Sequence, residues 1–108
     1  MNTKEIVELV KALSDTTTAE RADLPFEVGG KYFIRTVTYF ATGQVKKIIG
    51  KFLVLEDAAW IADTGRFRQA IMDGVLDEIE PVEVDMYLNT DTITDAFVWR
   101  HPLPKVQK

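Results

Sequence analysis

Few residues in this chain have side chains that could carry out catalysis. The chain has no cysteine, one serine, Ser14, and one histidine, His101. A serine nucleophile needs a base beside it, and a metal site needs several converging ligands. The carboxylate pairs at 56–57 and 77–78 lack the spaced oxygen ligands of a calcium loop, and His101 is expected at the surface. We therefore predict a protein that is not an enzyme and that binds neither metal nor cofactor.

The basic residues could instead contact phosphate. Lys46, Lys47 and Lys51 form the clearest basic cluster, although the formal net charge is −4. No Lys or Arg occurs between Arg68 and Arg100, where Asp and Glu are frequent. This balance argues against a protein that coats DNA. The lysines either contact single-stranded RNA or form a solvated surface, and the sequence leaves both readings open.

These side chains must be positioned by a small number of elements in 108 residues, which is enough for one domain. An apolar stripe predicts an N-terminal helix over residues 3–13. Aromatic and β-branched runs predict strands over 31–43, 44–49 and 51–61, with Gly43 and Gly50 between them. Strands are also predicted over 82–88 and 92–99. A short helix follows the capping pair Asp63-Thr64 and ends at Gly74, and residues 101–108 are predicted to form a C-terminal arm.

The order of these elements predicts a mainly β protein with helices. Short turns force the first three strands into an antiparallel meander, and the strand from Lys31 is apolar on both faces. Five short strands are too few for a two-sheet sandwich. We therefore predict a strongly bent five-stranded antiparallel sheet, or open barrel, over residues 31–100. Trp60 and Trp99 are expected in its core.

Two segments give this sequence a family resemblance. Residues 42–61, which include the run Leu53-Val54-Leu55-Glu56-Asp57-Ala58, resemble the first motif of Sm-like proteins. Residues 82–99 resemble the second motif, with Leu88-Asn89-Thr90-Asp91-Thr92-Ile93 at its turn. The resemblance implies an N-terminal helix, five strands and a ring of subunits, and it suggests a phage-encoded branch of the superfamily. Residues 59–81, with the short helix, are an insertion between the motifs.

The sequence departs from the family where Sm-like proteins contact RNA. The turn between the second and third strands, residues 49–52, lacks the Asp and Asn that contact bases in family members that bind uridine-rich RNA. The second-motif turn has Asn89-Thr90 in place of Arg-Gly, and Asp91 would repel phosphate. The remaining candidates for RNA contact are Lys46, Lys47, Lys51 and Asn89.

The resemblance also implies how copies of the chain associate. In Sm-like proteins the fourth strand of one subunit pairs with the fifth strand of the next, and residues 82–88 and 92–99 suit that arrangement. Tyr87, Ile93 and Phe97 are the candidate interface residues, unless they are core residues of a monomer. The expected assembly is a cyclic homo-oligomer of about five to seven subunits.

Two functions follow from this prediction. The chain is either a ring that binds single-stranded RNA without catalysis, or a structural or assembly adaptor ring, of phage origin, that contacts proteins and does not bind RNA. The N-terminus lacks a secretory signal and no apolar run is long enough to span a membrane. We therefore expect a cytoplasmic protein without a membrane partner.

Overall fold

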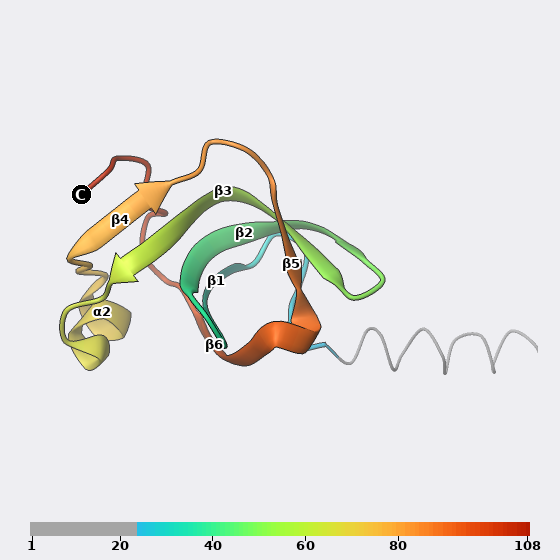
Figure 1. Ribbon diagram of the computed structural model, residues 1–108, viewed down its shortest axis with the longest axis horizontal. Helices are drawn as coiled ribbons and strands as arrows, with labels where there is room; N and C mark the ends of the chain where they lie inside the picture. Colours follow the sequence, from blue (N-terminus) through green and yellow to red (C-terminus); the bar gives the residue numbers. More distant parts are fainter. Residues whose placement is uncertain (1–23) are drawn as a thin grey trace, which may run out of the picture.

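A computed structural model of the protein describes residues 24–108 (Figure 1). The predicted N-terminal helix at 3–13 lies outside the described residues. The rest is mainly β, with one α-helix and a bent antiparallel sheet of six strands that does not close into a barrel. The elements are β1 (Lys31–Thr36), β2 (Phe40–Ile49), β3 (Phe52–Asp63), α2 (Phe67–Asp73), β4 (Glu78–Pro81), β5 (Met86–Asn89), the 3-10 turn η1 (Thr90–Thr92) and β6 (Ile93–Val98).

The sheet has one strand more than the five predicted, so that number was wrong. Its strands run in the order β4-β3-β2-β1-β6, and β5 also pairs with β3. β3 has 12 residues, and two short strands share its outer side. β5 pairs with Phe52–Leu55, and β4 pairs with Ala59–Asp63. β4 was missed because its four residues, of which two are glutamates and one is proline, carry little strand signal.

The predicted strand over 31–43 is in fact two strands joined by a turn. The Thr36 hydroxyl donates to the Tyr39 carbonyl oxygen (2.8 Å) and accepts from the Tyr39 amide (3.0 Å). Together with the bond from the Thr36 amide to the Tyr39 carbonyl oxygen (2.8 Å), these local bonds close a turn, so the chain reverses between Thr36 and Tyr39. Gly43 therefore lies inside β2 and does not separate two strands.

Gly43 instead allows the sheet to bend. A Cβ at this position would lie 3.0 Å from the Cβ of Leu55 on the neighbouring strand. The pairing of β2 with β3 shifts register at Gly43, between Thr42 and Gln44, and again just after it, between Val45 and Lys47. Asp57 on β3 has a φ of 50° in the same region. Bulges of this kind increase the twist and curvature of a strand pair.

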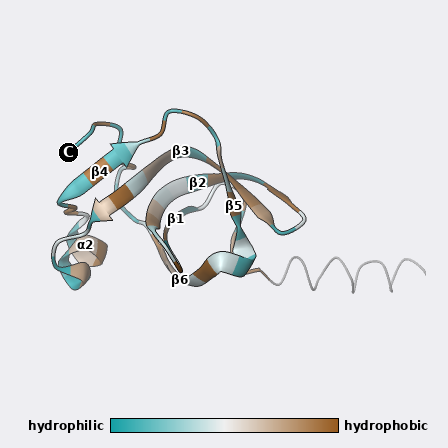
Figure 2. Cartoon of the chain, viewed as in Figure 1, coloured by the Kyte–Doolittle hydropathy of each residue, from teal (hydrophilic) through white to brown (hydrophobic). Residues whose placement is uncertain are grey.

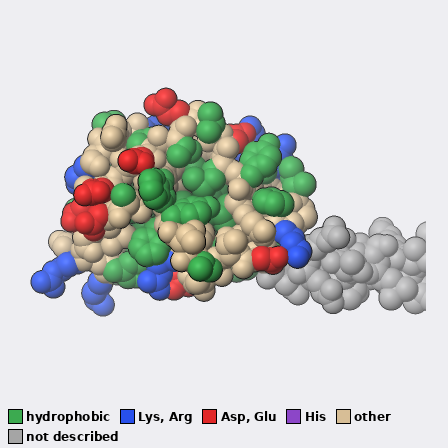
Figure 3. Space-filling view, in the orientation of Figure 1, with side chains coloured by type: hydrophobic (Ala, Val, Ile, Leu, Met, Phe, Trp, Pro, Cys, Tyr) green, Lys and Arg blue, Asp and Glu red, His purple; other side chains and the backbone are tan. Residues whose placement is uncertain are grey.

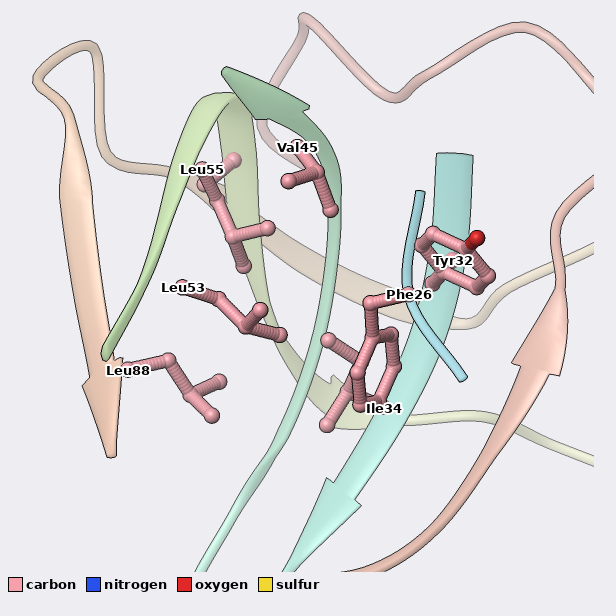
Figure 4. Close-up of a cluster of buried hydrophobic side chains, with 8 residues drawn as sticks. Phe26, Tyr32, Ile34, Val45, Leu53, Leu55 and Leu88 are labelled. Carbon is pink, nitrogen blue, oxygen red and sulfur yellow. The ribbon is translucent and has the colours of Figure 1, made fainter. Parts of the chain in front are cut away.

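The bend gives the sheet two cores, one on each face. The first lies inside the curve and contains Phe26, Tyr32, Ile34, Val45, Leu53, Leu55, Ala58 and Leu88 (Figure 4). The second lies on the opposite face, beside α2, and contains Phe33, Ala59, Ile61, Ala70, Leu76, Ile79 and Trp99. The prediction that the strand from Lys31 is buried on both faces is therefore confirmed for β1. Trp99 is buried as predicted, but Trp60 is 42% exposed, so its placement in the core was wrong.

The short helix is present where the sequence predicts it. α2 ends at Gly74, whose φ of 73° is left-handed and whose amide donates to the Ala70 carbonyl oxygen (2.9 Å). Asp63 does not cap the helix; it accepts from the amide of Gly65 and shapes the turn before α2.

The strand predicted over 82–88 begins only at Met86. Val82 packs against the first core, but Val84 is 70% exposed, and Glu83 has a φ of 60°. The segment between β4 and β5 is therefore a connection, despite its alternating sequence. In Figure 2 the neighbouring strand β4 is mostly hydrophilic.

Candidate functional site

The basic hairpin between β2 and β3 is largely neutralised by carboxylates. The Lys46 ammonium lies 2.9 Å from the Asp85 carboxylate, and the Lys51 ammonium lies 2.9 Å from the Asp91 carboxylate. The hydrogen bond and the charge of Asp85 raise the pKa of Lys46. Lys47 forms no ion pair with any carboxylate in the described part of the chain. The lysines selected from the sequence are therefore less available to phosphate than their spacing suggested.

Asn89 lies beside the hairpin turn. It is paired with Phe52 across the β3–β5 ladder, and the Thr90 amide donates to the Lys51 carbonyl oxygen (2.8 Å). The Asn89 side-chain oxygen accepts from the Asp91 amide and thereby caps η1. The structure thus brings Asn89 and Lys51 together, whereas Lys46 is bonded to the residue just before β5.

The outer edges of β5 and β6 have no strand partner within residues 24–108. β5 pairs only with β3, and β6 pairs only with β1, among the described strands. Of the predicted interface residues, Tyr87 is 63% exposed. Ile93 packs against the first core, and Phe97 packs against the second, where its ring lies 5.3 Å from that of Phe67. Ile93 and Phe97 therefore contribute to the monomer, whereas Tyr87 is left to solvent.

An ion pair fixes β6 to β1. The Arg35 guanidinium forms two hydrogen bonds with the Asp95 carboxylate and lies 4.7 Å from the centre of the Phe67 ring. Hydrogen bonding and the positive charge of Arg35 lower the pKa of Asp95. Because α2 contributes Phe67, this contact ties the helix, β1 and β6 together.

The outer edge of β4 is bridged by the C-terminal arm. The amide of Ile79 donates to the Lys108 carbonyl oxygen, and the Lys108 amide donates to the Ile79 carbonyl oxygen, each at 3.0 Å. The arm passes Trp99, whose indole N–H donates to the Pro102 carbonyl oxygen (3.2 Å). Residues 24–108 therefore have three outer strand edges, those of β4, β5 and β6, and the C-terminal arm covers part of the edge of β4.

His101 is half-buried rather than at the surface, which corrects the prediction. Its Nε2 lies 2.9 Å from the Ile71 carbonyl oxygen, to which it donates, and its ring packs edge-on against Trp99. It forms one wall of an apolar cleft between α2 and the end of β6. Sequence reasoning missed this cleft, because its walls come from two segments that are joined only in the fold.

Metal-ligand clusters and membrane-spanning helices are both absent from residues 24–108. No group of three or more His, Asp or Glu side chains within residues 24–108 could hold a metal ion. No helix in that range has the length and apolar character to cross a bilayer. Comparison with family models, curated proteins and solved structures gives no match for this chain.

Proposed function

We propose that this chain is a non-catalytic, Sm-like assembly module that associates with copies of itself. The outer edge of β5 in one copy pairs with the outer edge of β6 in the next. A head-to-tail contact of this kind forms a closed ring when its rotation closes, and a filament when it does not. The ring then acts as a structural or assembly adaptor that contacts other proteins.

The outer edges of β5 and β6, which have no strand partner within residues 24–108, are the observation that supports this proposal. Unpaired edges offer rows of amide and carbonyl groups to another strand, and proteins that remain monomeric usually block them. Tyr87 on β5 and Val98 on β6 are 63% and 60% exposed. Charged side chains or proline would discourage pairing at these positions, and neither residue is of that kind.

The ion pairs of the hairpin favour an adaptor over an RNA-binding ring. Phosphate would have to compete with Asp85 for Lys46 and with Asp91 for Lys51. The long acidic stretch between Arg68 and Arg100 would also repel nucleic acid. The acidic stretch would attract a protein partner with a basic surface more strongly than it would attract nucleic acid.

Light scattering on a sizing column tests self-association. We expect a mass that is a multiple of 12.3 kDa and that falls on dilution. A mass that stays at 12.3 kDa over an about hundredfold range of protein concentration would refute the proposal.

Single-stranded RNA binding is the second candidate. It is favoured by Lys47, which has no carboxylate partner among residues 24–108, and by the position of Lys51 beside Asn89. Filter binding with uridine-rich and adenine-rich oligonucleotides at low salt tests it. Retention that weakens steeply with salt would support RNA binding, and no retention at low salt would exclude it.

A further inference from the structure

A shallow aromatic cleft lies between the start of β2 and the second half of β3. It has a volume of about 270 Å³ and is lined by Thr38, Tyr39, Phe40, Trp60, Ile61 and Ala62. Trp60 is 42% exposed, and none of the lining residues carries a charge. Exposed aromatic residues that border a hollow are typical of contact surfaces, so this cleft is a candidate for one.

The sheet places Trp60 on the same face as the first core but at the far end of β3. Trp60 is paired with Ala41 of β2, which is itself paired with Ile34 of the first core. Residues that are directly paired across neighbouring strands share a face of the sheet. β5, which helps to enclose the first core, pairs only with Phe52–Leu55 in the first half of β3. The described chain therefore leaves Trp60 partly uncovered at this end of the sheet.

Tyr39 forms the second aromatic wall of the cleft. Its side chain packs against the first core, so it lies on the same face as Trp60. It comes two residues before Ala41, and such diagonal neighbours are about 7–8 Å apart, within reach of aromatic side chains. The backbone of Tyr39 is fixed by its bonds to the hydroxyl and the amide of Thr36. The cleft is therefore formed before anything binds, which lowers the entropy cost of binding.

Glu80 supplies a negative charge beside this cleft. It is paired with Trp60 across the β3–β4 ladder, and the Cβ atoms of such pairs are about 4.5–5.5 Å apart. Asp63 and Glu78, the last pair of that ladder, are both exposed. Figure 3 shows acidic side chains over β4, next to hydrophobic side chains that gather across the middle of the molecule. Lys105 borders a neighbouring groove with Glu80, but Glu80 forms no ion pair in the described part of the chain. This charge favours a cation as the occupant.

The protein itself shows how an aromatic ring and a carboxylate hold an arginine. The Arg35 guanidinium lies 4.7 Å from the centre of the Phe67 ring and is bonded to the Asp95 carboxylate. Trp60 and Glu80 offer the same two kinds of partner, with no arginine of the described chain between them. A planar guanidinium stacks on an aromatic face and forms two parallel bonds to a carboxylate, whereas a lysine ammonium has no planar face to stack.

We propose that the cleft at Trp60 takes an arginine side chain from a basic segment of a partner protein. The guanidinium stacks on the Trp60 ring and pairs with Glu80, and Tyr39 forms the other aromatic wall. This inference rests on the adaptor part of the proposed function, and it does not depend on the pairing of β5 with β6. A nucleobase also stacks on tryptophan, but the carboxylates of β4 would repel its phosphate.

Calorimetric titration with short synthetic peptides tests the inference. The probe is a peptide of Gly and Ser with three spaced arginines and blocked ends. The matched control peptide has citrulline, which has nearly the same shape but no charge, in place of each arginine. We expect the arginine peptide to bind and the citrulline peptide to bind about tenfold or more weakly. Equal binding of the two peptides, or no binding of the arginine peptide, would overturn the inference.

Protein variants locate the binding to the cleft. Trp60→Leu and Glu80→Gln should each raise the dissociation constant of the arginine peptide about fivefold or more. Glu27→Gln removes the same charge from an exposed residue that does not line the cleft, and it should change the constant little. In Trp60→Leu the remaining tryptophan, Trp99, is 2% exposed, so its emission reports whether the variant folds. Equal effects of Glu80→Gln and Glu27→Gln would mean that binding follows overall charge, against the inference.

The outcomes for this cleft and for self-association are separable. A parent protein that is monomeric throughout and binds the arginine peptide would overturn the proposed self-association and support the role of the cleft. A parent that associates and does not bind the peptide would do the reverse. Oligouridylate that binds the parent and is lost from Trp60→Leu would identify a nucleobase as the occupant and overturn the inference.

Discussion

Truncating Leu88 should destabilise the protein far more than truncating Val84, although the sequence presents them alike. Both belong to the alternating run Val82, Val84, Met86 and Leu88. Leu88 is fully buried opposite Leu53 in the first core, whereas Val84 is 70% exposed in the connection before β5. The pair therefore separates a strand that begins at Met86 from one that begins at residue 82.

The structure sets the expected magnitudes. Leu88→Ala removes a buried side chain from the inside of the curved sheet, which should cost about 2–4 kcal/mol of unfolding free energy, the lower part of the range reflecting an edge strand that can relax. Val84→Ala should change it by less than about 0.5 kcal/mol. In urea, the Leu88→Ala midpoint should fall by roughly 1–2 M.

Urea unfolding monitored by tryptophan fluorescence measures these costs. Trp99 is 2% exposed, so its emission should shift when the second core opens. Low protein concentration keeps the contribution of association small. Equal losses for the two variants would mean that residues 82–88 form one continuous half-buried strand. A negligible loss for Leu88→Ala would mean that β5 does not pack on β3.

Three further predictions follow from single contacts. Asp95→Asn should lower stability at pH 7; because Arg35 lowers the pKa of folded Asp95, the difference is present above its unfolded pKa of about 4 and disappears as pH falls through the folded value. Urea titrations at pH 7 and 3 check this, and a pH-independent difference would contradict it. Gly74→Ala should lower the Tm more than Gly29→Ala: both have positive φ, but only at Gly74 would a Cβ meet the His101 ring, at 2.6 Å. Equal Tm losses would contradict that contact. The double variant Asp85→Asn, Asp91→Asn frees two lysines and should raise oligouridylate retention on filters at low salt; unchanged retention would show that the hairpin does not contact phosphate.

Sequence patterns predicted the structure correctly where a few neighbouring residues determine it. The end of α2 at Gly74 needed only a left-handed residue after an apolar helical repeat. The turn at Gly50 needed only a glycine between two strand-like runs. The burial of β1 on both faces followed from consecutive large apolar residues, and Phe33 and Ile34 are both fully buried.

Sequence patterns did not predict the structure where contacts with a distant part of the chain determine it. Strand-like residues on both sides of Thr36 hid the turn that its hydroxyl stabilises. Alternation before β5 could not show that the chain at Val84 has no core to face. β4 exists because the second half of β3 has an outer side to be covered, which its own composition does not reveal.

The sequence identified the lysines of the candidate site, but it did not show that two of them form ion pairs with carboxylates of the same chain. Lys46 and Lys51 are exposed, as a basic cluster should be, but their carboxylate partners lie 39 and 40 residues away in the sequence. Only the folded chain places β5 and η1 against the hairpin. A cluster that looked free to bind phosphate is thereby largely satisfied within the protein.

Among the described residues, the outer edges of β4, β5 and β6 differ in a way that supports the proposal that copies associate through β5 and β6. β4 has Glu78, Glu80 and Pro81 along its four residues, and Lys108 bridges its outer edge through two hydrogen bonds. Charge, proline and a covering segment are the usual means by which an edge is kept from pairing. β5 and β6 instead expose Tyr87 and Val98, and an apolar cleft lies between α2 and the end of β6. Among the described residues, neither β5 nor β6 contains a proline or has its outer edge paired with another strand, so these are the edges at which a second copy should be sought.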